Sequence, residues 1–433
     1  MEAGGAGNVV RARQVGDFSW LVAGRLFRLG ASVVVGAWVA RYLAPSDFGE
    51  LSFLLSIVAL LSALGGAGLD GLVVRELVRR RSEAGEILGT AIGLRVGFGL
   101  VLYAILLASW AAASGVGREF WMVTLLGVDV VLQSGNVFDL YFQARTENKW
   151  PVLAGVAAVV VSSVVRIALI AAGATVVYFA AAVLVEGLVL AGCLAGLHRW
   201  RRTEAERWRF SGTRARLLLA ESWPMIVSAA AIAGCMRMDQ VILKWLAGEA
   251  SVGVYAAAAR LGEAWYFVPM FAGTVLNPWI LEGRTLGEAV YRQRLIRLYA
   301  VVFWGALGVA AVVFVTASPL IRLLYGAEYA GAVDPLRIHV AGGVFLAVGM
   351  AAGKWFVAEG HTVGLMRKAL CGLAVNLAGN MVLIPKYGVA GAALAAAAGH
   401  FAANVVYDLF DARVRPQLRL KLRAVVPWRF GSP

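Results

Sequence analysis

Apolar residues in this chain come in long blocks rather than in stripes with helical or strand spacing. Residues 31–40, 51–64 and 152–165 are examples. The hydrocarbon core of a bilayer is about 30 Å thick, and a helix needs roughly 20 mostly apolar residues to cross it. The strands of a membrane barrel would alternate apolar and polar residues instead. The blocks therefore predict an all-α polytopic membrane protein.

The composition excludes a protein that faces water on all sides. Of the 433 residues, 60% are hydrophobic and only 15% are charged, and the mean hydropathy is +0.75. A soluble domain carries roughly 25% charged residues. The three cysteines lie in apolar stretches and the four histidines show no metal-ligand spacing, so we expect no disulfide, metal or cofactor. The first apolar block, 18–40, is too long for the core of a cleavable signal peptide.

The blocks and the breakers between them predict about twelve transmembrane helices. We place these helices at 18–40, 47–67, 84–110, 119–142, 151–171, 174–196, 217–246, 252–281, 298–316, 333–357, 365–385 and 389–410. A basic cytoplasmic connection, 198–216, lies near the midpoint and leaves six spans on each side. This arrangement predicts two six-helix lobes related by pseudo-two-fold symmetry, at 1–197 and 217–410, followed by a basic cytoplasmic tail at 411–433.

A short sequence similarity between the two halves supports an internal repeat. Tyr42–Pro45 with Phe48-Gly49 matches Trp245–Gly248 with Val252-Gly253, at an offset near 203 residues. Both stretches fall between the first and second helix of a half. Repeats of this kind are typical of transporters, with the substrate site between the halves.

Positive charge in the connections predicts the orientation. Alternate connections, counted from a cytoplasmic N-terminus, hold 27 of the 40 Lys and Arg residues, and the opposite set holds four. Basic residues are retained on the cytoplasmic side, so we expect both termini to be cytoplasmic in a cell-membrane protein. Attraction to the anionic inner leaflet then explains most of the +14 net charge without nucleic acid. The segment Arg413–Phe430, where leucines alternate with basic residues, would lie on that surface or form a solvated tail.

Ionisable residues inside the predicted spans are the best candidates for function. Each costs roughly 2.5–3.5 kcal/mol at the centre of a membrane helix, so it normally faces a partner or an aqueous cavity. The candidates are Arg25, Arg28, Arg95, Asp129, Asp139, Arg166, Glu186, Arg237, Asp239, Lys244, Arg260, Glu263, Lys354 and Asp408.

Four groups of segments, in order along the chain, resemble a known family. They read RYLAPSDFG (41–49) with GLD (68–70), RMDQVIL (237–243) with VGVYAAA (252–258), LYGAEY (324–329) and IPKYGVAGAA (384–393). The segments resemble the oligosaccharide flippases, the O-antigen-type polysaccharide branch of the multidrug/oligosaccharidyl-lipid/polysaccharide exporter superfamily. The resemblance implies a two-lobed helical fold that moves lipid-linked oligosaccharides by alternating access. Many of the matching residues have a role in packing and turns, because Gly49, Gly253 and Gly391 would permit close approach of backbones.

Arginines are the candidates for binding the diphosphate of such a lipid. Arg25 and Arg28 share one face of the first helix, and a guanidinium binds phosphate oxygens bidentately. The alternative is that this pair reaches the cytoplasmic head groups. Arg237, Arg260 and Lys354 complete the substrate-binding set. For Arg260 a structural ion pair with Glu263, three residues on, is the preferred alternative.

Coupling to an ion requires a group that titrates or binds a cation. The candidates are Asp70, Asp129, Asp139 and Asp239. Burial and neighbouring charges act on such groups in opposite directions, so the sequence does not rank them. Asp70 has a second interpretation as a helix cap. The ion would be a proton or sodium.

The leading interpretation is a flippase, not an enzyme, that carries polyprenyl-diphosphate-linked oligosaccharide to the outer leaflet for surface polysaccharide assembly. Its partners would be membrane lipids, the lipid-linked sugar and the polymerase and glycosyltransferases of the same assembly. The nearer alternative is a cation-coupled drug or small-solute antiporter of the same superfamily. The distant alternative is a membrane glycosyl- or acyltransferase, which is disfavoured by scattered histidines and short outward connections.

Overall fold

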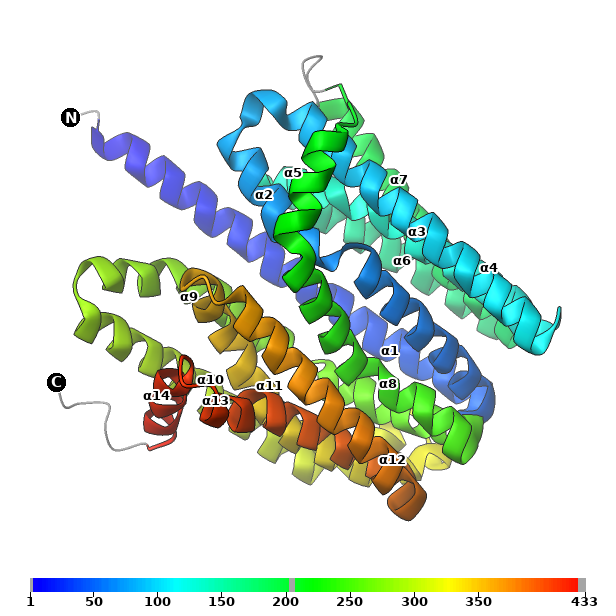
Figure 1. Ribbon diagram of the computed structural model, residues 1–433. Helices are drawn as coiled ribbons and strands as arrows, with labels where there is room; N and C mark the ends of the chain where they lie inside the picture. Colours follow the sequence, from blue (N-terminus) through cyan, green and yellow to red (C-terminus); the bar gives the residue numbers. More distant parts are fainter. Residues whose placement is uncertain (1–2, 202–206, 427–433) are drawn as a thin grey trace. The chain divides into compact units, whose positions relative to one another are not determined.

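The computed structural model describes residues 3–201 and 207–426, with side chains from Val22 onward apart from a few positions inside helices. These residues are helical and contain no strand (Figure 1). The helices are α1 (Ala3–Gly66), α2 (Asp70–Arg79), α3 (Ala84–Ser114), α4 (Arg118–Leu132), α5 (Val137–Ala144), α6 (Lys149–Ala171), α7 (Val176–Arg201), α8 (Gly212–Glu263), α9 (Phe267–Thr285), α10 (Glu288–Leu324), α11 (Val333–Ala358), α12 (Thr362–Phe401), α13 (Tyr407–Phe410) and α14 (Arg415–Val425). The predicted all-α polytopic class is confirmed.

The described residues contain nine helical stretches that are long and apolar enough to cross a membrane. Three of them, Val22–Arg79, Gly212–Met270 and Thr362–Phe410, have 58, 59 and 49 residues, which is enough for two crossings each. The long helices in these stretches, α1, α8 and α12, each have one internal residue with non-helical backbone angles, at Ala44, Gly248 and Gly388. Counted as two each, they give the twelve predicted spans.

The helix breaks have identifiable causes. Ala44 has φ 57° and ψ 172°, and the following Pro45 disfavours helical angles at the residue before it. Gly248 has φ 81° and ψ 174°, a conformation that glycine adopts without strain. The two breaks lie 204 residues apart, the offset that relates Phe48-Gly49 to Val252-Gly253 in the internal repeat. The third break, at Gly388 with φ 55° and ψ −130°, lies between the predicted spans 365–385 and 389–410, and the helix continues through Pro385.

Two glycines of the repeat make reciprocal contacts. A Cβ on Gly49 would overlap the carbonyl oxygen of Glu249, and a Cβ on Gly253 would overlap the carbonyl oxygen of Pro45. The same offset of 204 residues relates Gly49 to Gly253 and Pro45 to Glu249. The predicted close approach at these glycines is therefore present, and it joins the equivalent turns of the two halves.

The chain divides into two compact units. The first comprises residues 1–43 and 57–226, and the second comprises 44–56 and 227–433. The start of α8 belongs to the first unit, where Arg214 pairs with Glu86 at 2.9 Å. The predicted lobes remain a prediction, and residues 202–206 of the predicted connection and 427–433 of the tail lie outside the described residues.

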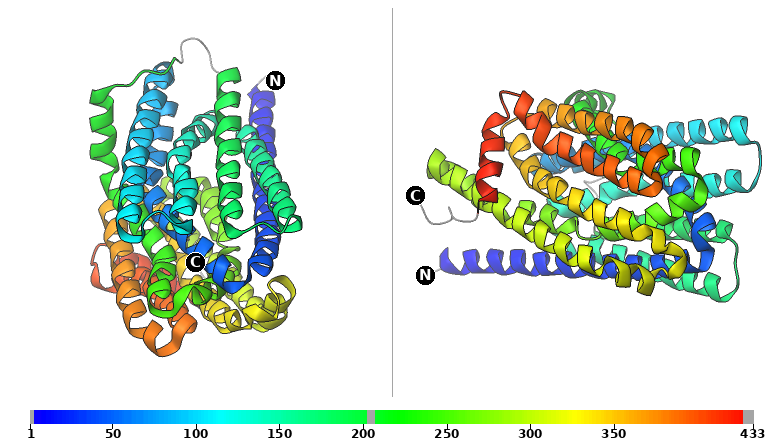
Figure 2. Two further views of the ribbon diagram at one scale, coloured as in Figure 1. Left: turned by 90° about the vertical axis from the view of Figure 1, so that its right-hand side faces the viewer. Right: turned by 90° about the horizontal axis from the view of Figure 1, so that it is seen from below.

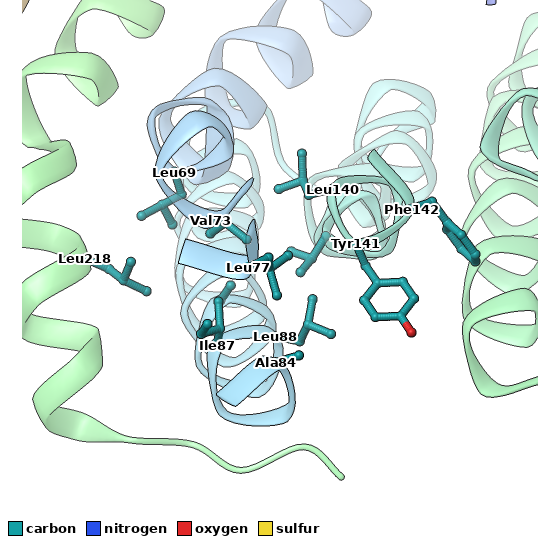
Figure 3. Close-up of a cluster of buried hydrophobic side chains, with 12 residues drawn as sticks. Leu69, Val73, Leu77, Ala84, Ile87, Leu88, Leu140, Tyr141, Phe142 and Leu218 are labelled. Atoms are coloured by element: carbon teal, nitrogen blue, oxygen red, sulfur yellow. The ribbon is translucent and has the colours of Figure 1, made fainter. Parts of the chain in front are cut away.

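A buried apolar cluster in the first unit fixes the helices that carry polar candidates. Figure 3 shows Leu69, Val73 and Leu77 beside side chains of α3 and α5. Leu69 directly precedes Asp70, and Leu140 directly follows Asp139. Packing of these leucines therefore determines where both carboxylates lie. In the second unit, α11 packs between α10 and α12 (Figure 2).

Candidate substrate and coupling sites

The predicted arginine pair lies on α1 in the first unit. Arg25 is exposed, whereas Arg28 is partly buried. The guanidinium of Arg28 occupies a notch at Gly155 of α6, where a Cβ would overlap it. The Arg28 Nε is buried and has no hydrogen-bond partner among the described residues. Both arginines interact electrostatically with Asp139 of α5, so the structure brings three predicted site residues together.

Asp70 forms an ion pair that the sequence analysis did not anticipate. It lies in the first turn of α2, and its carboxylate accepts a hydrogen bond from Arg95 of α3. Arg95 is 6% exposed and also donates to the carbonyl oxygen of Gly66 at 2.8 Å. The N-cap position of α2 is held by Leu69, and Asp70 is the first residue of the helix. The carboxylate of Asp70 thus has the buried Arg95 as its partner from the first turn of α2.

A cavity of about 300 Å³ adjoins this ion pair. Its lining includes Ser62, Asp70, Arg95, Gln133 and Asn136, which come from α1 to α4 and the turn after α4. The lining carries charged, hydroxyl and amide groups, so the cavity can hold water or a small polar group.

A second polar cluster lies between α4, α6 and α7. Asp129 accepts a hydrogen bond from Gln133 at 2.9 Å. Glu186 interacts electrostatically with Asp129, forms an ion pair with Arg166 at 2.8 Å and accepts a hydrogen bond from Ser162 at 2.9 Å. Because Gln133 also lines the cavity, this cluster adjoins the same polar region as Asp70.

Asp239 is the most enclosed of the predicted coupling residues. Its side chain lies in the second unit and the residue is 1% exposed. It accepts hydrogen bonds at 2.7 Å from the hydroxyl of Tyr255 and from the side-chain amides of Asn376 and Asn380. Asp239 and Tyr255 lie on opposite sides of the break in α8, and both asparagines lie on α12. The carboxylate therefore ties together three helical segments.

This network offers several oxygen atoms to a cation. Asp239 supplies a carboxylate and Tyr255 a phenol. Each asparagine would present its amide oxygen instead of its amino group after a half-turn of the amide. The Oδ1 of Asn380 is buried and has no hydrogen-bond partner among the described residues. A hard cation or a proton could be held here, because such cations prefer oxygen ligands.

Arg237 has Glu263 as its partner, a pair that spacing did not suggest. The guanidinium of Arg237 binds both carboxylate oxygens of Glu263, at 3.0 and 3.4 Å. The break at Gly248 brings the two arms of α8 together and makes this pair possible. Glu263 was expected to pair with Arg260, whose guanidinium lies 4.7 Å from the ring centre of Phe48.

The remaining site predictions have mixed outcomes. Lys354 belongs to α11, but its side chain lies outside the described residues. The structure groups Arg25, Arg28 and Asp139 in one unit and Arg237, Glu263 and Asp239 in the other. Sequence reasoning missed Asn376 and Asn380, although two asparagines four residues apart in an apolar span share a helix face and are a usable signal.

Comparison with known sequences gives two matches. A family described as "Polysaccharide biosynthesis protein" matches residues 15–283, which include every predicted site residue except Lys354. The succinoglycan biosynthesis transport protein ExoT of Rhizobium meliloti (strain 1021) is 24% identical over 254 residues. That match covers 57% of this chain and 49% of the relative, so the chain spans about half the length of the curated relative it matches.

Comparison with solved structures gives matches over nearly the whole chain. An inward-facing multidrug resistance MATE family transporter of the MOP superfamily has a TM-score of 0.70 and 16% identity, covering 93% of this chain and 100% of that one. The lipid II flippase MurJ in an inward closed conformation has a TM-score of 0.69 and 14% identity, covering 95% and 90%. At this identity the two structures show the fold alone.

Proposed function

This chain belongs to the polysaccharide biosynthesis protein family, and from that premise we propose that it is a flippase for polyprenyl-diphosphate-linked oligosaccharide. The family resemblance predicted from the sequence is confirmed, and the chain is a multi-pass membrane protein of this family. Its activity as a transporter is part of the proposal. The proposal adds the cargo, its passage from the cytoplasmic to the outer leaflet by alternating access, and cytoplasmic termini in the cell membrane.

The observation that carries the proposal is the arginine pair on α1. A diphosphate needs donors that remain charged, and guanidinium groups meet this need. Arg28 has a buried Nε with no hydrogen-bond partner among the described residues, and Arg25 is exposed beside it. Asp139 offsets part of the positive charge of the pair before substrate arrives. A phosphate oxygen would give Arg28 the acceptor that it lacks.

The coupling site that we favour is Asp239. Of the four candidate carboxylates, Asp70 is paired with Arg95, and Asp139 interacts with Arg28 and Arg25. Asp129 and Asp239 each have an acidic neighbour, Glu186 and Glu263, and Asp239 is the more enclosed of the two. Asp239 is bound only by neutral donors in the hydrogen bonds described above. Binding of a proton or sodium there would replace those hydrogen bonds and alter the contact between α8 and α12.

The test is a transport assay on matched variants. Inverted membrane vesicles from a strain that lacks the chromosomal gene would be loaded with lipid-linked oligosaccharide. Arg25→Gln and Arg28→Gln should each reduce flipping about tenfold, because a charged hydrogen bond contributes about 1.5–3 kcal/mol. Arg41→Gln, at another exposed position of α1, is the matched control and should transport normally. Normal flipping by both α1 variants at wild-type abundance would contradict the proposed cargo site.

A drug or solute antiporter is the second candidate, because a MATE transporter matches the fold as well as the flippase does. Expression in a drug-sensitive host separates the two. The flippase proposal predicts unchanged drug tolerance and restored surface polysaccharide. Increased tolerance without restored polysaccharide would favour the antiporter.

A further inference from the structure

The last described helix, α14, is docked onto the second unit. It packs against α10 and α13, beside the end of the last span (Figure 1). The hydroxyl of Tyr299 donates to the side-chain oxygen of Gln417 at 2.5 Å. The ammonium of Lys421 donates to the carboxylate of Asp408 at 2.5 Å. These contacts hold α14 at the point where the chain leaves the predicted membrane region.

An apolar groove begins under α14. Its volume is about 240 Å³, and most of the residues that line it are apolar, beside Tyr299, Asn404 and Lys421. The residues that line the groove belong to α10, α11, α12, the π-helical turn Ala402–Val406 and α14. They include Phe303, Val344, Val348, Phe401, Val405 and Leu422. Val344 and Val348 lie in the middle of α11, so the groove extends from the docked helix into the predicted membrane region.

The outer side of α14 carries a row of arginines. Arg415, Arg419 and Arg423 are each four residues apart and all three are exposed. Arg415 donates through Nε to the carbonyl oxygen of Leu409, whereas neither Arg419 nor Arg423 has an ion pair within the described part of the chain. The exposed Leu422 lies next to this row. A helix with exposed arginines beside exposed leucine has the character of one that lies in the membrane interface.

We propose that α14 and the groove form a binding site for one anionic phospholipid of the surrounding bilayer. One acyl chain occupies the groove, and the phosphate binds Arg419 and Arg423. Guanidinium groups suit a phosphate that carries net negative charge, and basic residues near the interface favour anionic lipid. The helix contains no Asp or Glu that could receive the ammonium of a zwitterionic head group. The charge of α14 therefore selects among lipids that the apolar groove alone would not distinguish.

Native mass spectrometry of the purified full chain tests this proposal. Protein would be exchanged into equal mixtures of phosphatidylglycerol and phosphatidylcholine, and the first bound lipid would be identified. Wild type should retain phosphatidylglycerol. Arg419→Gln/Arg423→Gln should weaken that binding about fivefold for each arginine removed. The control Arg199→Gln/Arg413→Gln removes the same charge from exposed positions outside α14 and should bind as wild type does.

A second variant tests the groove separately from the charge. Val348→Phe adds apolar volume inside the groove and should reduce binding of phosphatidylglycerol without altering net charge. The melting temperature of each variant without added lipid shows whether the fold is intact. Equal retention of both lipids by wild type, or an equal loss in the Arg199/Arg413 control, would overturn the proposal. Displacement of phosphatidylglycerol by an equimolar polyprenyl phosphate would also overturn it, because the groove would then serve the transported lipid.

Discussion

At the residue scale, the contact between the turns at Pro45 and Glu249 depends on the absence of side chains at two glycines. Gly49 and Gly253 each lie where a Cβ would overlap a carbonyl oxygen. Neither neighbour is a flexible side chain that could move aside, so any larger residue requires a shift of the backbone. The contact therefore constrains both turns at once.

Gly49→Ala and Gly253→Ala should each lower the free energy of unfolding by about 3 kcal/mol or prevent accumulation, because overpacking is costly in a close-packed site. Thermal unfolding in detergent measures the effect. Gly305→Ala is the matched control in α10, where nothing lies within 4 Å of an added Cβ. That control should be neutral or stabilise the helix by up to about 1 kcal/mol. Equal melting temperatures for all three variants would contradict the close contact.

Asp239→Asn should weaken both stability and coupling. The new amide places an amino group among three donors, which leaves buried groups unsatisfied at a cost of about 1–3 kcal/mol. We expect a lower melting temperature and loss of the dependence of transport on proton or sodium gradients. Asp334→Asn, whose carboxylate is 77% exposed, should change stability by less than about 1 kcal/mol. Retention of ion dependence in Asp239→Asn would move the coupling site elsewhere.

At the scale of elements, the sequence predicted where the chain crosses the membrane better than what each helix touches. The apolar blocks and Pro45 located the first crossings and the break between them. The partners of Glu263 and Asp239 were not predictable from spacing, because spacing compares residues on one helical segment. Arg237 lies 26 residues from Glu263, and Asn376 lies 137 residues from Asp239. Only the folding of α8 at Gly248 and its packing on α12 bring them together.

The packing of α14 against the second unit could also not be predicted from the sequence. Alternating leucines and basic residues were read as a surface-bound or solvated tail. The structure buries one face of this helix, with Leu418, Leu420 and Lys421, against the second unit, which neither reading included. The reason is a buried acceptor on another element, Asp408, whose residue is 0% exposed. A buried carboxylate requires a partner, and Lys421 reaches it from α14.

Lys421→Met should destabilise the second unit by about 3 kcal/mol, because it leaves the Asp408 carboxylate buried without its cation. Asp408→Asn/Lys421→Met should recover part of that loss. A double-mutant cycle on melting temperature and unfolding free energy measures the coupling. Strictly additive effects of the two substitutions would show that the pair does not hold α14.

At the scale of the whole molecule, the charge distribution predicts topology. A fluorescent protein fused after Pro433 should fluoresce, and alkaline phosphatase fused there should be inactive. Phosphatase inserted at Gly117, between α3 and α4, should be active. Insertion after Arg145, in the next connection, is the control and should be inactive. Phosphatase activity of the fusion after Pro433 would contradict the orientation that the 27 basic residues indicate.

The reciprocal contact of Gly49 and Gly253 bears on how such a chain arose. Each turn gives its counterpart the same contact that it receives, as identical subunits do across a two-fold axis. An ancestral protein half this size, carrying one such turn, can meet a second copy of itself in the same way. In this chain the break itself differs between the two turns, with alanine at 44 and glycine at 248, whereas the contact of each glycine with a carbonyl oxygen is the same in both.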